Sequence, residues 1–484
     1  MKSSSLYSMF NPRSVALVGA SSDPSKIGYR LAANLLSQPF KGKFFFINPG
    51  GGTILGQGVL RSVDELPDGI DLLILAIPKT ALLSSVRSGV RKSVKSIVAL
   101  TAGFREAGEE GRASEEQLRE VLRGSRTRLV GPNCAGLADT GSSLYATIEI
   151  YPPRGRIAMV SQSGSLCSAF SSNMRIRQVG ISKYISLGNK VDVNEADLIE
   201  YLGEDEASNC IALYLEDVSD GRRLREVASR VCRTKPIVAL KSGRTDEGAR
   251  ATFSHTGAMA GADALVEGAL HQMGVLRVED LTGLYDLSAA LSLLGPLPER
   301  QIAVLSDAGG PGVIATDAAV QAGLMLPALS EETGRKLAGV LPSFSSIRNP
   351  IDMTFTRDVR LYGKCIEELE KDSFAAVLVT IPSHFAVKEE LVTVLVEARK
   401  RQGLPLVVAW LAADEVEEQR RELWKRGIPC FTDPQRAAAV LGSLSRYGLW
   451  LSKRNHSAAR RRQDHTGKRF DNWQGSGYNQ CFDT

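Results

Sequence analysis

Histidines, paired cysteines and long apolar runs are all scarce in this sequence. Only five histidines occur in 484 residues, and the seven cysteines are odd in number, scattered, and form no C-x-x-C pair. This spacing argues against a disulfide framework and against a zinc site, so no metal ligands are predicted. No apolar run reaches the ~18 to 20 residues of a membrane span, and the N-terminus lacks the charged-then-apolar order of a signal peptide. We therefore expect a protein of the reducing cytoplasm that does not enter a membrane.

The sequence also lacks a strong charge imbalance. Its net charge is +5, and part of that excess comes from a basic C-terminal stretch at 453–462. The body of the protein is close to neutral, so nucleic-acid binding is not indicated. A chain of 484 residues that is 43% hydrophobic is too large for one core. Length and composition predict a multidomain protein of about three domains.

The N-terminal part alternates short apolar runs with helical patterns. Residues 14–19 form a β-branched apolar run that leads into a small-residue loop at 20–28 and a helical pattern at 29–36. Such alternation predicts a parallel sheet covered by helices on both faces. Further strands are predicted at 43–48, 71–78 and 94–100.

The loop after the first strand suits a phosphate-containing ligand, but not a nicotinamide dinucleotide. It lacks G-x-G-x-x-G, and Asn48 stands about 20 residues past Gly28, where such enzymes carry an acidic residue. A nicotinamide-dependent oxidoreductase is disfavoured and stays an alternative. Lys26 and several hydroxyls suit the diphosphate of another adenosine-containing ligand at a helix N-terminus. A tight structural turn explains Gly19 and Gly28 equally well.

Two later segments repeat the strand, loop and helix plan. Residues 156–165 and 301–312 open this way, about 140 residues apart, which matches ordinary domain size. Linkers are predicted near 125–136 and 295–299, where Gly and Pro interrupt the apolar pattern. The predicted fold is α/β, with three doubly wound parallel-sheet domains. Their predicted bounds are 1–128, 129–296 and 297–451, followed by a polar, disordered tail at 452–484.

Three places in the middle domain carry candidate chemistry. Ser163 and Gly164 precede a helix, so their N–H groups form either an anion cradle or an ordinary N-cap. Glu216 ends an apolar strand and either orients an imidazole or is solvated. His255 sits in a small-residue stretch that is predicted to be a loop. There it is either a nucleophile or a hydrogen-bonded loop residue. These alternatives stay open on the residues alone.

Taken in order, these segments resemble the α subunit of the ADP-forming acyl-CoA synthetases, typically acetate–CoA ligase, which are relatives of succinyl-CoA synthetase. The resemblance covers roughly residues 8–450. It implies a Rossmann-like CoA-binding domain followed by two flavodoxin-like domains. The matching segments are 15–28, 42–49, 77–78, 101–104, 108–111, 131–134, 161–164, 188–192, 214–216, 254–257, 309–312 and 349–354.

The resemblance implies a mechanism and a set of site residues. His255 would be phosphorylated by an acyl phosphate and would pass the phosphoryl group to ADP. Glu216 would orient the imidazole, and the N–H groups of Ser163 and Gly164 would hold the phosphate. CoA, as a substrate, would be bound by Gly19, Ser21, Ser22, Lys26, Asn48, Pro78, Gly103 and Asn133.

The chain has no G-x-x-x-x-G-K-[ST] and no stretch that resembles an ATP-grasp domain. The resemblance therefore implies an ATP-grasp β partner that carries ADP or ATP and Mg²⁺, in an αβ or α2β2 assembly. Small acids and acyl-CoA would be the substrates. Asp217 departs from the family, which has Gly there, and the basic tail has no counterpart. A CoA-binding regulatory or scaffold protein without turnover is the alternative reading.

Overall fold

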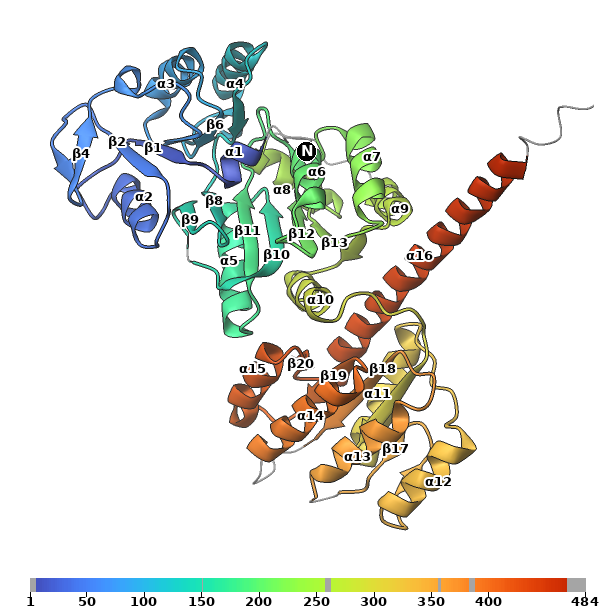
Figure 1. Ribbon diagram of the computed structural model, residues 1–484. Helices are drawn as coiled ribbons and strands as arrows, with labels where there is room; N and C mark the ends of the chain where they lie inside the picture. The colour runs from blue at the N-terminus through green and yellow to red at the C-terminus, as the bar shows by residue number, and fades with distance from the viewer. Residues whose placement is uncertain (1–5, 150, 257–262, 356–357, 383–387, 468–484) are drawn as a thin grey trace, which may run out of the picture.

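The computed structural model describes residues 6–149, 151–256, 263–355, 358–382 and 388–467. These residues form three sheets in which parallel pairing dominates, each surrounded by helices (Figure 1). The predicted α/β class with three sheets is confirmed. The strands predicted at 14–19, 43–48, 71–78 and 94–100 are all present.

The first sheet has the strand order β3-β4-β2-β1-β5-β6-β7. Alternate residues of β1 enter two different cores. Val15 and Leu17 pack with Leu31 of α2, while Ala16 and Val18 pack with Leu82 of α3. Both faces of the sheet are therefore covered. Its elements are α1 (Tyr7–Phe10), β1 (Ser14–Val18), α2 (Ile27–Leu36), β2 (Lys43–Ile47), β3 (Thr53–Ile54), β4 (Gln57–Leu60), η1 (Val63–Glu65), β5 (Leu72–Leu75), α3 (Lys79–Arg91), β6 (Ser96–Ala99), η2 (Arg105–Ala107), α4 (Glu109–Leu122) and β7 (Arg128–Val130).

The second sheet has the order β14-β13-β12-β10-β11-β8-β9 and is mixed. The hairpin of β8 and β9 precedes β10, and β8 pairs antiparallel with β11. The prediction that the strand at 156 opens this sheet was therefore wrong. The elements are β8 (Gly136–Asp139), β9 (Leu144–Thr147), β10 (Arg154–Ser161), α5 (Gly164–Ile176), β11 (Ile181–Ser186), α6 (Glu195–Glu204), β12 (Cys210–Leu215), α7 (Gly221–Val231), β13 (Ile237–Lys241), α8 (Asp246–Thr256), α9 (Asp263–Met273), β14 (Leu276–Val278) and α10 (Leu281–Leu294).

The third sheet has the order β16-β17-β15-β18-β19-β20. Its last helix, α16, is the longest of the described part, and its C-terminal end projects away from the body (Figure 1). The elements are β15 (Ile302–Ser306), α11 (Gly309–Gln321), α12 (Glu331–Val340), β16 (Ser346–Ile347), β17 (Ile351–Asp352), α13 (Arg360–Leu369), β18 (Ala376–Ile381), α14 (Lys388–Gln402), β19 (Leu406–Trp410), η3 (Asp414–Val416), α15 (Glu417–Lys425), β20 (Cys430–Phe431) and α16 (Pro434–Gly467).

Two sequence-based boundaries differ from the structure. The segment predicted as a linker near 125–136 contains β7, which pairs with β6, so the predicted boundary at 128/129 falls inside a strand. The tail predicted to be disordered from residue 452 continues α16 as far as Gly467. Residues 468–484 of that tail lie outside the described residues.

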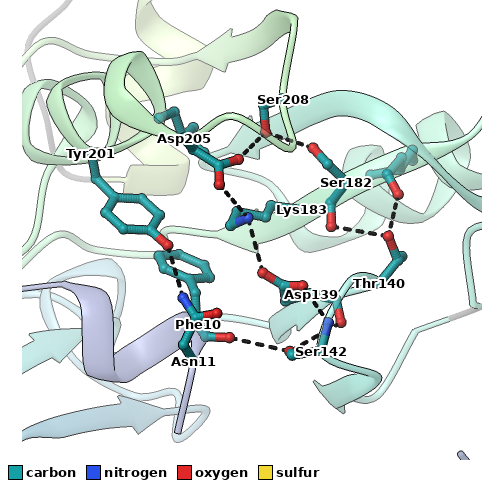
Figure 2. A network of polar contacts seen from close by, with 12 residues as sticks. Phe10, Asn11, Asp139, Thr140, Ser142, Ser182, Lys183, Tyr201, Asp205 and Ser208 are labelled. Carbon is teal, nitrogen blue, oxygen red and sulfur yellow. Dashed lines mark hydrogen bonds and ion pairs between the residues drawn. The ribbon is translucent and has the colours of Figure 1, made fainter.

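A buried polar network fastens the N-terminal helix to the second sheet (Figure 2). Lys183, which is 3% exposed, pairs with Asp139 and Asp205 at 2.9 Å each. Phe10 of α1 stacks on Tyr201 of α6 with ring centroids 4.8 Å apart. These contacts lie at the amino ends of the parallel strands β11 and β12. The opposite edge of the sheet carries the predicted site residues.

Candidate functional site

The residues predicted to bind CoA lie along one edge of the first sheet. Gly19, Asn48, Pro78, Gly103 and Asn133 follow β1, β2, β5, β6 and β7, so each stands at a carboxyl end of a parallel strand. The winding of the sheet reverses at β1, which lies between β2 and β5. In open α/β sheets, ligands bind at such a switch point.

Close backbone packing at this point requires the two glycines of the loop. Gly19 has φ +88°, and a Cβ on it would lie 2.1 Å from the carbonyl oxygen of Ala76. A Cβ on Gly28 would lie 1.9 Å from the carbonyl oxygen of Gly19. Asn48 donates from Nδ2 to the Ala20 carbonyl at 2.8 Å and so fixes the loop. The structural explanation of these glycines therefore holds, and it places the loop beside the end of β5.

The polar residues of the loop face outward. Ser22 and Lys26 are exposed, and Ser21 accepts a hydrogen bond from the Asp23 N–H at 3.1 Å. Lys26 occupies the N-cap position of α2, and no side chain caps that helix. A cation and hydroxyls beside an uncapped helix N-terminus suit an anionic ligand. CoA binding by these residues stays a prediction.

Gly103 and Asn133 instead build the junction between the first and second sheets. Gly103 donates its N–H to Glu106 Oε1 at 2.6 Å, and Asn133 donates from Nδ2 to Asn189 Oδ1 at 3.3 Å. Asn189 Nδ2 in turn donates to Glu106 Oε2 at 2.6 Å and to Glu115 Oε1 at 2.7 Å.

The environment of Glu106 favours its carboxylate. Burial alone would raise the pKa of Glu106, but hydrogen bonds from Asn189 and from backbone N–H groups outweigh it and hold the pKa below its usual value. No role was predicted from the sequence for Glu106, Glu115 or Asn189. Their only signal was their place in or near segments that resemble the family.

The predicted catalytic residues lie at the carboxyl edge of the second sheet. Ser163 and Gly164 follow β10, Glu216 follows β12, and α8 follows β13. Ser163 is the N-cap of α5 and accepts from the Leu166 N–H at 3.4 Å. The capping interpretation is therefore satisfied, and anion binding at this turn stays a prediction.

Glu216 is 7% exposed, so the solvated alternative does not hold. Burial and the nearby charge of Glu216 raise the pKa of the Tyr214 hydroxyl. Burial also lowers the pKa of Lys241 at the end of β13, although Asp217, Asp263 and Glu216 act in the opposite direction. The carboxylate thus sits in a desolvated setting, where its charge acts strongly on a neighbouring group.

One glutamine connects the α5 turn with the strand that ends at Glu216. Gln162 Oε1 accepts the backbone N–H groups of Glu216 and, at 3.1 Å, of Asp217. Gln162 Nε2 donates to Asp217 Oδ1. Lys190 Nζ lies 2.8 Å from that same oxygen and 3.1 Å from Glu195 Oε2. Asp217 stood out in the sequence only as a departure from the family, and its contacts with Gln162 and Lys190 were not predicted.

His255 lies in the last turn of α8, so the loop prediction for its backbone was wrong. Gly248 donates its N–H to Thr245 Oγ1 at 3.0 Å at the start of this helix, and Asp246 and Glu247 occupy the first turn, where acidic residues are favourable. α8 contacts η2 of the first sheet. The helix that carries His255 therefore lies between the carboxyl edges of two sheets. The His255 side chain lies outside the described residues.

Three negative findings concern the described part of the chain. There, no group of three or more His, Cys, Asp or Glu residues is placed to hold a metal ion. No helix in that part is long and apolar enough to cross a bilayer. The six cysteines that the structure describes are all buried and free.

Three known domain families match successive parts of the chain. Residues 13–140 match a CoA binding domain, 154–291 a succinyl-CoA ligase like flavodoxin domain, and 302–453 a ligase-CoA domain. The α subunit of acetate–CoA ligase [ADP-forming] I from Pyrococcus furiosus is 36% identical over 93% of this chain and 99% of its own. The chain belongs to the ADP-forming acetate–CoA ligases. It corresponds to the α subunit of these enzymes, which are acid–thiol ligases.

Other ADP-forming ligases show how much of the whole enzyme the chain represents. Acetate–CoA ligase [ADP-forming] I of Archaeoglobus fulgidus is 36% identical over 92% of this chain, which spans 64% of that relative. A solved dinucleotide forming acetyl-coenzyme A synthetase 1 of Candidatus Korarchaeum cryptofilum, in complex with phosphate and ADP, has a TM-score of 0.88 at 33% identity. The structural match covers 93% of this chain and 98% of the solved chain. The three-sheet fold is therefore that of an ADP-forming ligase.

Proposed function

We propose that this chain is the catalytic α subunit of an ADP-forming acid–CoA ligase, with acetate as the default acid. The enzyme interconverts acyl-CoA, ADP and phosphate with the free acid, ATP and CoA. The observation that carries the proposal is the position of α8. The helix of His255 follows β13 beside Glu216 and the α5 turn, and it contacts η2 at the edge of the CoA-binding sheet.

The reaction proceeds in three balanced steps. An oxygen of inorganic phosphate attacks the thioester carbonyl, the C–S bond breaks, and CoA leaves as a thiolate that takes up a proton. An imidazole nitrogen of His255 then attacks the phosphorus of the acyl phosphate, the P–O bond to the acyl oxygen breaks, and the carboxylate leaves. A terminal oxygen of ADP finally attacks that phosphorus, and breakage of the P–N bond gives ATP and free histidine.

The residues of this chain have separate tasks in these steps. The N–H of Gly164 at the start of α5 holds the phosphate by preorganised electrostatics, while the N–H of Ser163 is donated to Ser161 Oγ at 3.1 Å and shapes the turn. Glu216, desolvated at the end of β12, orients the imidazole and supports its positive charge. CoA lies over the carboxyl edge of the first sheet, where Ser21, Ser22 and Lys26 contact its phosphates and Gly19, Asn48, Pro78, Gly103 and Asn133 shape the surface.

The binding site for ADP or ATP lies on a second polypeptide. The single-chain relative from Archaeoglobus extends well beyond the 64% of its length that this chain spans, and the Pyrococcus relative is named a subunit. An ATP-grasp β subunit would supply the remainder and bind ADP or ATP with Mg²⁺, in an αβ or α2β2 assembly. The buried free cysteines suit a reducing cytoplasm.

The test is phosphorylation of the enzyme assembled with its β subunit. Labelled ATP and Mg²⁺, or acetyl-CoA with labelled phosphate, should place an acid-labile label on this chain. His255→Ala should carry no label, while His271→Ala, altered in the next helix, should carry as much as the wild type.

Two outcomes would overturn the proposal. Label that persists in His255→Ala would exclude this residue as the carrier. CoA binding measured by calorimetry without any labelling would instead identify a regulatory or scaffold protein.

A further inference from the structure

Gln162 joins the proposed phosphate turn to the proposed imidazole-orienting carboxylate. Its backbone N–H donates to the Tyr214 carbonyl at 3.2 Å, and its side chain accepts from the N–H groups of Glu216 and Asp217. Ser163 and Gly164 follow it directly. Any shift of this side chain would therefore change the position of Glu216 relative to α5.

The orientation of the Gln162 amide is fixed by its neighbours. Burial would raise the pKa of Asp217, but the charge and hydrogen bond of Lys190 and the hydrogen bond of Gln162 hold that pKa below its usual value. An ionised carboxylate only accepts hydrogen bonds, so the amide nitrogen must face Asp217. The amide oxygen must then face the two backbone N–H groups. Lys190, whose side chain is fully buried, holds Asp217 in place through Oδ1 and the main-chain oxygen.

The third sheet contains the same turn after its strand β15 as the second sheet has after β10. It lacks the bridge of side-chain hydrogen bonds that Gln162 makes to Glu216 and Asp217. Ser161 Oγ donates to the Ser163 carbonyl and accepts from its N–H at 2.7 and 3.1 Å, and Ser306 does the same with Ala308 at 2.7 and 3.2 Å. Asp307 stands at the position equivalent to Gln162, and its Oδ1 has no hydrogen-bond partner among the described residues. The turn therefore forms without a glutamine, and the bridge is a separate property of the second sheet.

We propose that Gln162 is a positioning residue for phosphoryl transfer, held in one orientation by Asp217 and Lys190, which sets Glu216 against the amino end of α5. This inference rests on the proposed function, because its readout is phosphorylation of His255. Gln162 follows β10 of the second sheet, whereas the proposed CoA-binding residues follow strands of the first sheet. Its removal should therefore change the transfer rate and leave CoA affinity as it is.

Exchanging the side-chain amide of Gln162 and the carboxylate of Asp217 tests the proposal. Gln162→Glu keeps the acceptor oxygens but sets two carboxylates against each other, and it should slow phosphorylation of His255 by roughly 10- to 100-fold. Gln162→Glu combined with Asp217→Asn restores a donor facing an acceptor and the original net charge. The double variant should recover to within a few-fold of the wild type, with unchanged CoA affinity by calorimetry.

A matched carboxylate at the other edge of the same sheet supplies the control (Figure 2). The side chain of Asp205 is 13% exposed and pairs with buried Lys183 at 2.9 Å, while that of Asp217 is 11% exposed and pairs with Lys190 at 2.8 Å. Asp217→Asn should slow labelling several-fold, whereas Asp205→Asn should leave its rate within about 2-fold when both are folded by circular dichroism.

The outcomes separate the two proposals. An unlabelled wild-type enzyme overturns the proposed function itself. A labelled wild type with an unslowed Gln162→Glu variant overturns the role of Gln162, and so does a double variant that fails to recover although it is folded. Equal slowing in Asp205→Asn would assign the effect to general loss of stability.

Discussion

Asn189 donates from its side-chain nitrogen to Glu106 Oε2 at 2.6 Å, across the junction between the first and second sheets. Glu106 reaches back to the N–H of Gly103 at 2.6 Å, after β6. The residue after Asn189 is Lys190, which holds Asp217. The loop between β11 and α6, at 187–194, thus touches the CoA-binding edge on one side and the proposed phosphoryl site on the other.

This junction predicts a pH-dependent effect of Asn189→Asp. The change sets a third carboxylate against Glu106 and Glu115 and removes a buried donor, so we expect a loss of about 1 to 3 kcal/mol at pH 8. The pKa of Glu106 is lowered in the native protein, so the stability it contributes is present above its unfolded pKa and falls as the carboxyl is protonated. That loss begins only below the ordinary pKa value of 4.5. Thermal unfolding at pH 8 and pH 3.5 therefore measures the change, and the defect should shrink at pH 3.5.

Asn173→Asp is the matched control for that experiment. Asn173 Oδ1 already accepts from Arg177 at 2.9 Å, so an aspartate there gains an ion pair. Its melting temperature should not fall. An equal fall in both variants would contradict the assigned role of the junction.

Glu216→Gln should slow transfer of the phosphoryl group to and from His255. The substitution keeps the size of the buried side chain but removes the negative charge that supports an imidazolium. We expect a decrease on the order of 10²-fold in the labelling rate, measured by rapid quench. Glu226→Gln, on the exposed face of α7, should label at the wild-type rate. Wild-type labelling by Glu216→Gln would remove Glu216 from the site.

Lys26→Ala should weaken CoA binding. Lys26 is exposed at the N-terminus of α2, beside the switch point of the first sheet, where it can neutralise a phosphate. We expect an increase of roughly 10-fold in Kd at low salt that diminishes as ionic strength rises, because exposed charges are screened. Isothermal titration with CoA measures it. Lys43→Ala alters an exposed lysine at the opposite edge of the same sheet and should bind CoA normally.

Asp307→Asn should stabilise the protein at alkaline pH. Burial raises the pKa of Asp307 to about 6, above an unfolded value of 3.8. A carboxyl with a raised pKa favours folding while it is protonated, and this contribution is lost as pH rises through about 6. A neutral amide avoids that loss, which amounts to about 3 kcal/mol from the size of the shift. Its melting temperature relative to the wild type should be higher at pH 8 than at pH 4.5.

The control for this prediction is Asp317→Asn, on the exposed side of α11. Its melting temperature relative to the wild type should not depend on pH between 4.5 and 8. A pH-independent effect of Asp307→Asn would show that the carboxyl is ionised at no cost in the native protein.

The sequence determined the strands whose signals are local. The apolar runs at 14–19 and 43–48 form β1 and β2, because such runs flanked by turn residues are suited to buried parallel strands. Gly19, Asn48 and Glu216 were placed correctly at strand ends by the same local pattern. For the C-terminal part of α16, composition led to a wrong prediction of disorder. A polar stretch after residue 452 looks disordered in isolation, yet good helix formers extend an existing helix without the cost of nucleation.

Only the tertiary structure decided which side chains meet. Gln162, Lys190 and Asp217 lie far apart in sequence, and their contact depends on β10 and β12 lying side by side with the loop after β11 folded against them. Glu106 and Asn189 meet only because two separate sheets share a junction. A hydrogen bond between distant residues leaves no periodic trace in the chain. The sequence therefore determined the strands and the family, while packing between sheets decided the surroundings of Glu216 and of the helix that bears His255.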